Sequence, residues 1–357
     1  MSTSAQTTAD PPKASPPSGS EGRAWLSELA PRLGLVGVWI IVIAVFALLR
    51  PDTFFTTQNL QTTLSTQAVP LMVALALIPG LAAGEYDLSV GGVMGLSLVL
   101  VGFLNVEQGW ALLPAIGVAM AAGIFVGAVN AFFIVAIGIE SLVVTLGMGT
   151  LLAGVALGIQ SLPVSGVSES LVDVSRTNLF GVQLVFYYGL ALVLALWYVL
   201  SHTPLGRYLY FVGEGRNVAR LSGIRVDAIR VGALIAGSTI SAAAGVFQAG
   251  LIGGADPTIG PTLLLPAFAA AFLGATAIVP GRFNPWGTFI AVYFLATGIV
   301  GLQLIGLSGW IEQVFYGAAL ILAVAASRLA SKRDRPAWLS RTARIRPNTP
   351  AKGDNAA

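Results

Sequence analysis

Two carboxylates, Glu85 and Asp87, lie between long apolar stretches and are the residues best suited to chemistry inside a membrane. The stretches 68–83 and 88–104 contain no charged residue. As helices they would measure roughly 24–26 Å at about 1.5 Å per residue, slightly less than a bilayer core of about 30 Å. Acidic residues at such a junction are costly to place and are candidates for proton relay or substrate binding.

The spacing of the two acids disfavours a shared site. Residues two apart on a continuous helix point about 200° away from each other, so Glu85 and Asp87 would not form a paired-carboxylate relay. Asp87 is placed to cap the following helix by accepting from the backbone N–H of Ser89 or Val90, with contact to a substrate as the alternative. For Glu85 the simplest expectation is a solvated carboxylate at the inner mouth of a pathway.

Uncharged polar side chains in or near the apolar stretches form a second group of candidates. They offer the hydrogen-bond donors and acceptors that an uncharged polar ligand needs, without fixed charge. The alternative is hydrogen bonding between helices, worth about 0.6 kcal/mol on average, and this is the favoured interpretation for each. The uncharged candidates are Gln67, Asn130, Thr145 and Gln248. Together with Glu85, Asp87 and Ser89 they are the candidates for the transport core or substrate pathway.

Residues for enzyme chemistry are scarce. The sequence has no cysteine, and His202 is its single histidine, so a metal cluster, a Cys/His pair or a Ser-His-Asp triad has no basis. The lysines are Lys13, Lys332 and Lys352, all near the ends, and no P-loop is present. We therefore expect no catalytic site, no metal site and no cofactor in this chain.

The composition predicts the elements that must position these residues. Of 357 residues, 55% are hydrophobic and 10% are charged, whereas soluble domains carry about 25% charged residues. The chain is predicted to be all-α, a polytopic transmembrane helical bundle of about ten spans. The expected spans are 33–49, 65–83, 89–105, 111–136, 142–160, 184–201, 230–252, 264–279, 286–305 and 309–328.

Charge placement orients this bundle. With the N-terminus inside and an even number of spans, only Arg50 and Arg176 among the basic residues fall outside, as the positive-inside rule expects. Both termini are therefore predicted to be cytoplasmic. The predicted organisation is a disordered tail over 1–32, a transmembrane domain over 33–328 and a basic tail over 329–357. The net charge of +3 then marks the cytoplasmic face and does not indicate nucleic acid as a partner.

Glycine spacing predicts close helix packing. Gly91, Gly92 and Gly95 lie on one predicted span, and Gly117, Gly123 and Gly127 on another. Small residues at such spacing allow helix backbones to approach closely. The sequence therefore favours a compact bundle.

The hydrophilic loop 202–229 is the most informative cytoplasmic segment. Asn217 is predicted to cap a short helix over 218–222 that ends at Gly223 in the left-handed conformation. Ala219 and Leu221 would give this helix a small apolar surface, suited to docking a soluble partner. An ordinary connector is the alternative.

Two motifs, at residues 84–91 and 203–224, resemble motifs that ABC importer permeases of the ribose/xylose type carry in the same order. Residues 203–207 read Thr-Pro-Leu-Gly-Arg, and residues 213–224 read Gly-Glu-Gly-Arg-Asn-Val-Ala-Arg-Leu-Ser-Gly-Ile, similar to the coupling loop of that family. Residues 84–91 are similar to its Gly-Gly-x-Asp-Leu-Ser-Val-Gly signature, with Glu85 replacing the second glycine. Residues 145–147 and 257–260 also match, and the resemblance covers about 60–328.

The resemblance implies the membrane subunit of a bacterial monosaccharide importer in the cytoplasmic (inner) membrane. Two permease copies would form the pathway, a separate ATPase would bind ATP and Mg, and a periplasmic or extracellular binding protein would deliver the sugar. Residues 214–223 would dock the ATPase, and the coupling residues carried over are Glu214, Asn217, Ala219, Arg220, Leu221 and Gly223.

Two segments depart from the family pattern. Residues 262–269 lack an acidic residue before an Ala-rich run, and 280–286 replace a glycine-rich turn, so the identity of the sugar is left open. An ion-coupled secondary carrier of a small polar metabolite is the alternative function. The scarcity of acids within the predicted spans and the absence of lysine or arginine from the middle of any span argue against that carrier.

Overall fold

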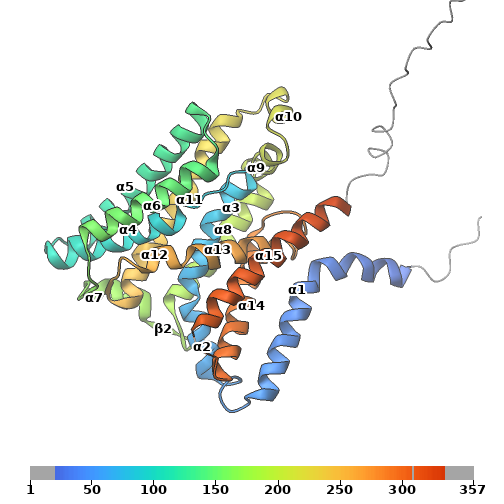
Figure 1. Cartoon of the computed structure of the whole chain (residues 1–357), viewed down its shortest axis with the longest axis horizontal. Helices are drawn as coiled ribbons and strands as arrows, with labels where there is room; N and C mark the ends of the chain where they lie inside the picture. Colours follow the sequence, from blue (N-terminus) through green and yellow to red (C-terminus); the bar gives the residue numbers. More distant parts are fainter. Residues whose placement is uncertain (1–20, 308, 334–357) are drawn as a thin grey trace, which may run out of the picture.

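A computed structural model describes residues 21–307 and 309–333, and its architecture is helical (Figure 1). The elements in chain order are α1 (Glu21–Leu49), α2 (Thr57–Thr66), α3 (Ala68–Ala82), α4 (Val90–Gly102), the π-helix η1 (Phe103–Glu107), α5 (Leu112–Ala131), the π-helix η2 (Phe132–Ile137), α6 (Ser141–Ile159), β1 (Val164–Ser165), α7 (Glu169–Arg176), β2 (Asn178–Leu179), β3 (Val182–Gln183), α8 (Leu184–His202), α9 (Pro204–Glu214), α10 (Arg216–Leu221), α11 (Val226–Ile252), β4 (Gly254–Ala255), α12 (Ile259–Thr262), α13 (Leu264–Gly274), α14 (Pro285–Leu304) and α15 (Trp310–Arg333).

The predicted all-α membrane class is confirmed. Within the described residues, seven helical segments are long and apolar enough to cross a membrane, and three shorter apolar helices fall at the other predicted spans. The shorter ones are Leu33–Leu49, Ile259–Gly274 and Trp310–Ala325. The count of ten spans and the sides of the termini stay predictions.

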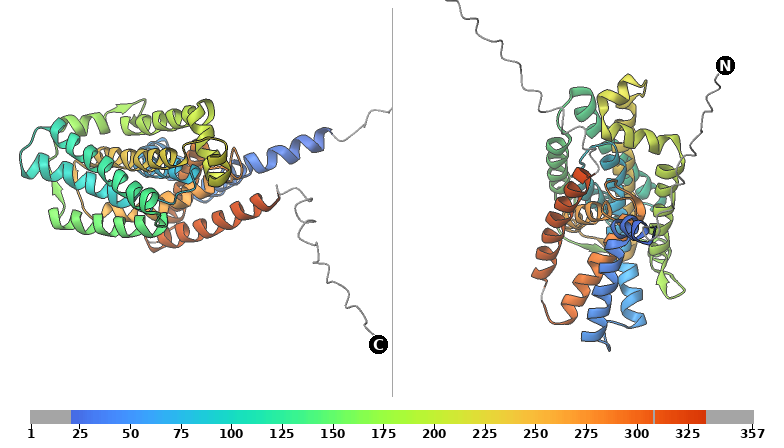
Figure 2. Two further views of the ribbon diagram at one scale, coloured as in Figure 1. Left: turned by 90° about the horizontal axis from the view of Figure 1, so that it is seen from above. Right: turned by 90° about the vertical axis from the view of Figure 1, so that its right-hand side faces the viewer.

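The ends of the chain only partly overlap the described residues. Helix α1 begins at Glu21 and α15 ends at Arg333, so both extend into segments predicted to be tails. Residues 1–20 and 334–357 of those predicted tails lie outside the described residues. Helix α1 packs on α14, where Trp39 Nε1 donates to Thr297 Oγ1 at 2.9 Å, and it lies at the edge of the bundle (Figure 2).

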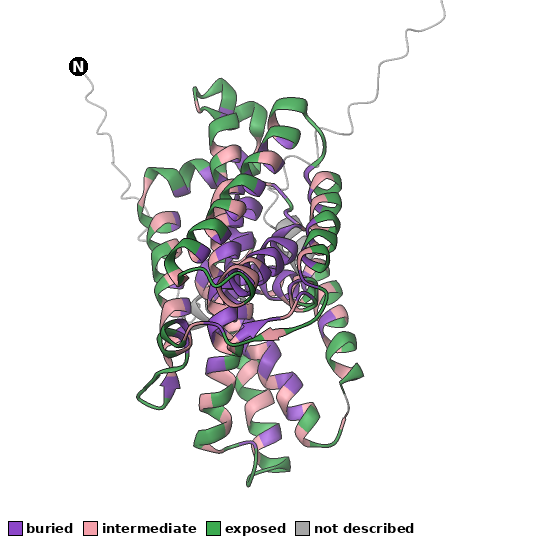
Figure 3. Cartoon of the chain, turned by 90° about the vertical axis from the view of Figure 1, so that its left-hand side faces the viewer, coloured by how far each residue is buried: buried purple, intermediate pink, exposed green. Residues whose placement is uncertain are grey.

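Helix α3 forms the centre of the core. All of its residues except Pro70 are buried, and it is enclosed by α8, α11, α13 and α14. A helix that is apolar on all sides is expected to be surrounded by other helices. Buried residues gather accordingly along the middle of the bundle, and exposed ones lie on its periphery (Figure 3).

Glycines line the contacts of α4 and α5 with their neighbours. A Cβ at Gly92 would lie 2.8 Å from the carbonyl oxygen of Gly149 on α6, and one at Gly127 would lie 2.8 Å from Cα of Ile235 on α11. These contacts confirm the predicted close packing for both helices. Gly117 is the exception, because it is exposed and a Cβ there would meet no atom within 4 Å.

Two short antiparallel strand pairs complete the described architecture. Strand β1 pairs with β4 in the register Val164↔Ala255, and β2 pairs with β3 in the register Asn178↔Gln183. The first pair joins the segment after α6 to the end of α11. These pairs lie at the ends of helices opposite to α10 (Figure 1).

Candidate functional site

The chain breaks between α3 and α4, and this break organises the candidate site. Helix α3 ends at Ala82, and Gly84 adopts φ +77°, a left-handed conformation that glycine accommodates without strain. Glu85 N then donates to Gly80 O at 2.9 Å, which closes the turn. Residues 85–87 follow in non-helical conformation before α4 begins at Val90.

Asp87 accepts the predicted hydrogen bond from Ser89 N, but it is not the N-cap of α4, because Ser89 occupies that position. Its Oδ1 accepts from the backbone N–H of Ser89 at 2.9 Å and from the Ser89 hydroxyl at 2.6 Å. Asp87 Oδ2 is buried and has no hydrogen-bond partner among the described residues. One oxygen therefore orders the turn, and the other is left available beside it.

Side chains from α6 satisfy the backbone of the break. Thr145 Oγ1 accepts a hydrogen bond from Leu88 N at 2.9 Å and donates one to Tyr86 O at 3.0 Å. Ser141 Oγ accepts from Tyr86 N at 3.2 Å. Irregular backbone at membrane depth is tolerated when protein groups satisfy it in this way.

Asn130 completes the cluster from α5. Its Nδ2 donates to Ser89 Oγ at 2.9 Å, and its Oδ1 is buried without a partner among the described residues. Four of the predicted core residues, Asp87, Ser89, Asn130 and Thr145, are thus brought together. Their observed bonds join helices, which was the favoured interpretation from sequence for Asn130 and Thr145.

Gln67 and Gln248 lie away from this cluster. Gln67 precedes α3 at the end opposite the break, and the 15 residues of α3 separate the two by roughly 22 Å. Gln248 lies near the C-terminal end of α11 and is partly buried. The structure therefore does not place these two residues in one site with Asp87.

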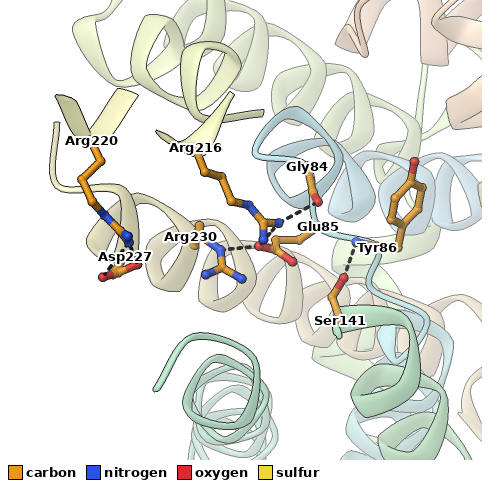
Figure 4. Close-up of polar contacts among 8 residues, drawn as sticks. All are labelled: Gly84, Glu85, Tyr86, Ser141, Arg216, Arg220, Asp227 and Arg230. Carbon is orange, nitrogen blue, oxygen red and sulfur yellow. Dashed lines mark hydrogen bonds and ion pairs between the residues drawn. The ribbon is translucent and has the colours of Figure 1, made fainter. Parts of the chain in front are cut away.

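Glu85 is not solvated, and the expectation of a carboxylate open to water was wrong. Its side chain is 1% exposed, and its Oε1 accepts from Arg216 Nη2 at 2.8 Å and from Arg230 Nε. Arg216 Nη2 also donates to Gly84 O at 3.2 Å, so it holds both side chain and backbone of the break (Figure 4). Two positive charges compensate a carboxylate that burial would otherwise destabilise.

Sequence reasoning missed both arginines as partners of Glu85. They follow it by 131 and 145 residues, and each was assigned only to the cytoplasmic charge pattern. A buried acid needs a nearby positive charge, and the coupling loop was the richest source of arginine. That combination was the available signal.

Helix α10 is the short helix predicted in the cytoplasmic loop, with corrected bounds. It runs from Arg216 to Leu221, and its N-cap position is Gly215, without a capping side chain. Asn217 lies inside the helix, so its predicted capping role is wrong. Gly223 has φ +80°, and Ile224 N donates to Ala219 O while Gly223 N donates to Arg220 O, both at 3.1 Å. This is a Schellman motif, and it confirms the glycine stop.

The exposed face of α10 differs from the expected one. Ala219 is fully buried against Val212 and Val226, so it anchors the helix and is not part of its surface. Leu221 is 90% exposed and Val218 is 58% exposed. The apolar surface offered by α10 is therefore Val218 and Leu221.

Helix α9 packs α10 against the break. A Cβ at Gly84 would lie 3.4 Å from Cα of Gly213, so the two backbones touch, and α9 runs beside the end of α3 (Figure 1). Tyr210 of α9 donates to Phe283 O at 2.6 Å, and burial raises the pKa of its hydroxyl to about 12, which keeps it a donor. Glu214 pairs with Arg282 at 2.9 Å. The loop segment is thus tied to the core and to the α13–α14 connection.

The arrangement provides binding and movement more readily than bond chemistry. In the part of the chain that the structure describes, no three His, Cys, Asp or Glu side chains are grouped to hold a metal ion. The acids of the break are occupied by Ser89 and by arginine. A polar, irregular break linked to an exposed surface helix suits a moving element of a transport pathway.

Comparison with known proteins gives a consistent result. A family profile described as "Branched-chain amino acid transport system / permease component" matches residues 59–324. The chain is 29% identical to the ribose import permease protein RbsC of Escherichia coli (strain K12), over 85% of this chain and 94% of that protein. It is 26% identical to the D-allose transport system permease protein AlsC of the same strain, over 84% and 93%. It is 29% identical to the autoinducer 2 import system permease protein LsrD of Photorhabdus laumondii, over 81% and 89%. No solved structure matches the chain.

Proposed function

We propose that this chain, which belongs to the family of branched-chain amino acid transport system permease components, is the membrane-spanning subunit of an ATP-driven monosaccharide importer. Its similarity to ribose and D-allose import permeases identifies it as a sugar ABC importer permease. The observation that carries the proposal is α10, a short helix with exposed Val218 and Leu221. Its first residue, Arg216, donates a hydrogen bond to Glu85 in the break between α3 and α4. ATP and Mg would be bound by a partner ATPase that docks on this helix.

The substrate is proposed to be a neutral, polyhydroxylated molecule. The relatives are named for import of ribose, D-allose and autoinducer 2. At the break, Asp87 Oδ2 and Asn130 Oδ1 are acceptors without partners among the described residues, and a hydroxyl-rich ligand would supply donors to them. We assign Asp87, Ser89, Asn130 and Thr145 to the transport core, and leave Gln67 and Gln248 as separate candidates along the pathway.

The assembly is proposed to contain two permease copies and a periplasmic or extracellular binding protein in the bacterial cytoplasmic (inner) membrane. Helices α5, η2 and α6 expose many apolar side chains, among them Phe125, Phe132 and Leu151, that lipid or a second copy would cover. ATP-driven closure of the partner ATPase would move α10, and rigid shifts of packed helices would then switch the pathway between outward and inward openings.

An ion-coupled carrier is the alternative, and the geometry gives it little support. Such a carrier needs an acid that can gain and lose a proton as the pathway opens. Glu85 is held by two guanidinium groups, and Asp87 accepts two hydrogen bonds from Ser89. Both carboxylates therefore hold the break together, Glu85 through the two arginines and Asp87 through Ser89.

The deciding experiment is uptake in cells and proteoliposomes with the co-purified ATPase. We expect a soluble ATPase to co-purify with the permease, and sugar uptake to stop when ATP is depleted while surviving an uncoupler. Uptake that collapses with the uncoupler and survives ATP depletion would establish the carrier instead. A ligand screen on the binding protein by thermal shift would then identify the sugar.

A further inference from the structure

Glu85, Arg216 and Arg230, termed here the Glu85 triad, join three elements at one carboxylate. Glu85 belongs to the break between α3 and α4, Arg216 opens α10, and Arg230 lies in the first turns of α11 (Figure 4). We propose that the Glu85 triad is the link through which movement of α10 reaches the break in the transport core. This inference rests on the proposed function, and it assigns Glu85 and Arg216 as positioning residues for coupling.

Arg216 connects α10 to the break by two hydrogen bonds. Its Nη2 donates to Glu85 Oε1 at 2.8 Å and to Gly84 O at 3.2 Å, so one guanidinium holds a side chain and the adjoining backbone. Charge-assisted bonds of this kind fix direction as well as distance. Because Arg216 is the first residue of α10, a shift of that helix acts directly on residues 84 and 85.

Arg230 supplies the fixed side of the link. It is buried on α11, a helix that packs along α3, α4 and α5, and Ser241 of α11 also donates to Val90 O at the start of α4. The carboxylate of Glu85 is therefore held between a helix of the transmembrane core and a helix of the cytoplasmic surface. When the distance between α10 and α11 changes, the contacts of Glu85 with Arg216 and Arg230 must change as well.

The two arginines differ in how easily they can release the carboxylate. The Arg216 side chain is 45% exposed, so water can solvate its guanidinium when the pair separates. Arg230 is buried and stays beside Glu85, which prevents an uncompensated buried charge when Arg216 leaves. The Arg216 contact is thus the one that can be made and broken at low cost during a cycle.

Tyr86 carries the displacement onward. Its ring stacks on Phe272 of α13, with centroids 6.3 Å apart and planes 10° from parallel, and its N–H donates to Ser141 of α6. Moving Glu85 therefore moves a side chain that contacts α13 and a backbone group that contacts α6. The chain of contacts runs from α10 through Arg216, Glu85 and Tyr86 to two helices of the core.

The test replaces Arg216 by glutamine in the complex of the permease with its co-purified ATPase. The matched control is Arg225→Gln, which removes an exposed charge from the segment after α10 and is three residues beyond its C-cap. We expect Arg216→Gln to retain the ATPase and its hydrolysis rate while sugar taken up per ATP falls at least about fivefold, the lower end of typical coupling between sites. Arg225→Gln should match the parent protein.

A conformational readout distinguishes coupling from a purely structural role. The chain has no cysteine, so Tyr86→Cys introduces a single thiol at a partly exposed position beside Glu85. Trapping the ATPase with nucleotide should change the rate of thiol labelling in Tyr86→Cys, which keeps the Arg216–Glu85 contact, and adding Arg216→Gln should abolish that change.

Three outcomes separate the proposals. Unchanged uptake per ATP in Arg216→Gln, or a nucleotide response that persists at position 86, would overturn the Glu85 triad as the link. Loss of ATPase co-purification in Arg216→Gln would also overturn it, by making Arg216 a docking residue. If the parent protein itself takes up sugar without any ATPase, the proposed function fails first.

Discussion

Glu85 accepts a hydrogen bond from the guanidinium of Arg230, 145 residues later in the chain, and both residues are buried. The pair fastens the break after α3 to the beginning of α11. Arg216 adds a third, more exposed member at 2.8 Å from the same oxygen. The segment from α10 to the start of α11 is therefore attached directly to the break between α3 and α4.

Replacing Glu85 by leucine should destabilise the protein strongly. Arg230 would then be buried without its partner, and breaking one side of a buried ion pair costs about 3–5 kcal/mol. Arg216→Leu should cost about 1 kcal/mol or less, because that side chain is 45% exposed and Arg230 still compensates Glu85. Denaturant titration of the purified protein in mild detergent would measure both.

The double variant Glu85→Leu/Arg230→Leu provides the control for this prediction. Removing both charges avoids an unpaired buried ion, so the double variant should be more stable than Glu85→Leu alone. A double variant that is less stable than Glu85→Leu would contradict the buried-pair explanation.

Local sequence patterns predicted the elements of the fold well. Runs of apolar residues placed most of the long helices within about five residues of their observed bounds, although α1 begins well before its predicted start and α2 was not separated from α3. Gly223 predicted the end of α10 because local geometry decides a helix stop. Asp87 predicted its own hydrogen bonds for the same reason, since Ser89 is two residues away.

Contacts across long sequence separations were not predictable. The partners of Glu85 depend on how α9, α10 and α11 fold back onto α3, and no local pattern carries that information. The orientation of α10 was also unpredictable, because Ala219 is buried only through Val212 and Val226 on neighbouring helices. Asn217 was assigned to a cap since the helix was expected to begin two residues later than it does.

Replacing Gly213 by alanine should disturb the packing of α9 on the break. The added Cβ would collide with the carbonyl oxygen of Ala82, and overpacking of this kind costs about 1–3 kcal/mol. Gly215→Ala is the control, because its Cβ would meet only the side chain of Val218 at 3.8 Å and its φ of −175° suits any residue. Thermal unfolding in detergent should show a lower midpoint for Gly213→Ala than for Gly215→Ala. Equal midpoints would mean that the contact between α9 and the break adjusts freely.

Replacing Asp87 by alanine should reduce stability and sugar uptake without weakening ATPase docking. The change removes the acceptor for Ser89 N and Ser89 Oγ just before α4, and loss of an intramolecular hydrogen bond costs about 1 kcal/mol. Asp87→Asn keeps an acceptor oxygen and should retain more of the stability. Uptake assays and ATPase co-purification on the same preparations would separate the two effects. Weakened docking in Asp87→Ala would place the break on the coupling surface.

Replacing Leu221 by aspartate should weaken ATPase binding while leaving the permease folded. Leu221 is 90% exposed at the end of α10, and full burial of a leucine side chain in an interface contributes about 1.5–3 kcal/mol. We therefore expect at least about a tenfold weaker affinity for the ATPase, measured by titration of the purified partner. Phe180→Asp is the matched control, because Phe180 is also 90% exposed. Phe180 lies in the turn between β2 and β3 at the N-terminal end of α8, whereas α10 lies beyond the C-terminal end of α8. Its φ of +53° is one that aspartate tolerates. Ala219→Glu should instead lower the stability of α10 itself, since Ala219 is buried. If Leu221→Asp binds the ATPase as tightly as Phe180→Asp does, the docking surface lies elsewhere on the cytoplasmic face.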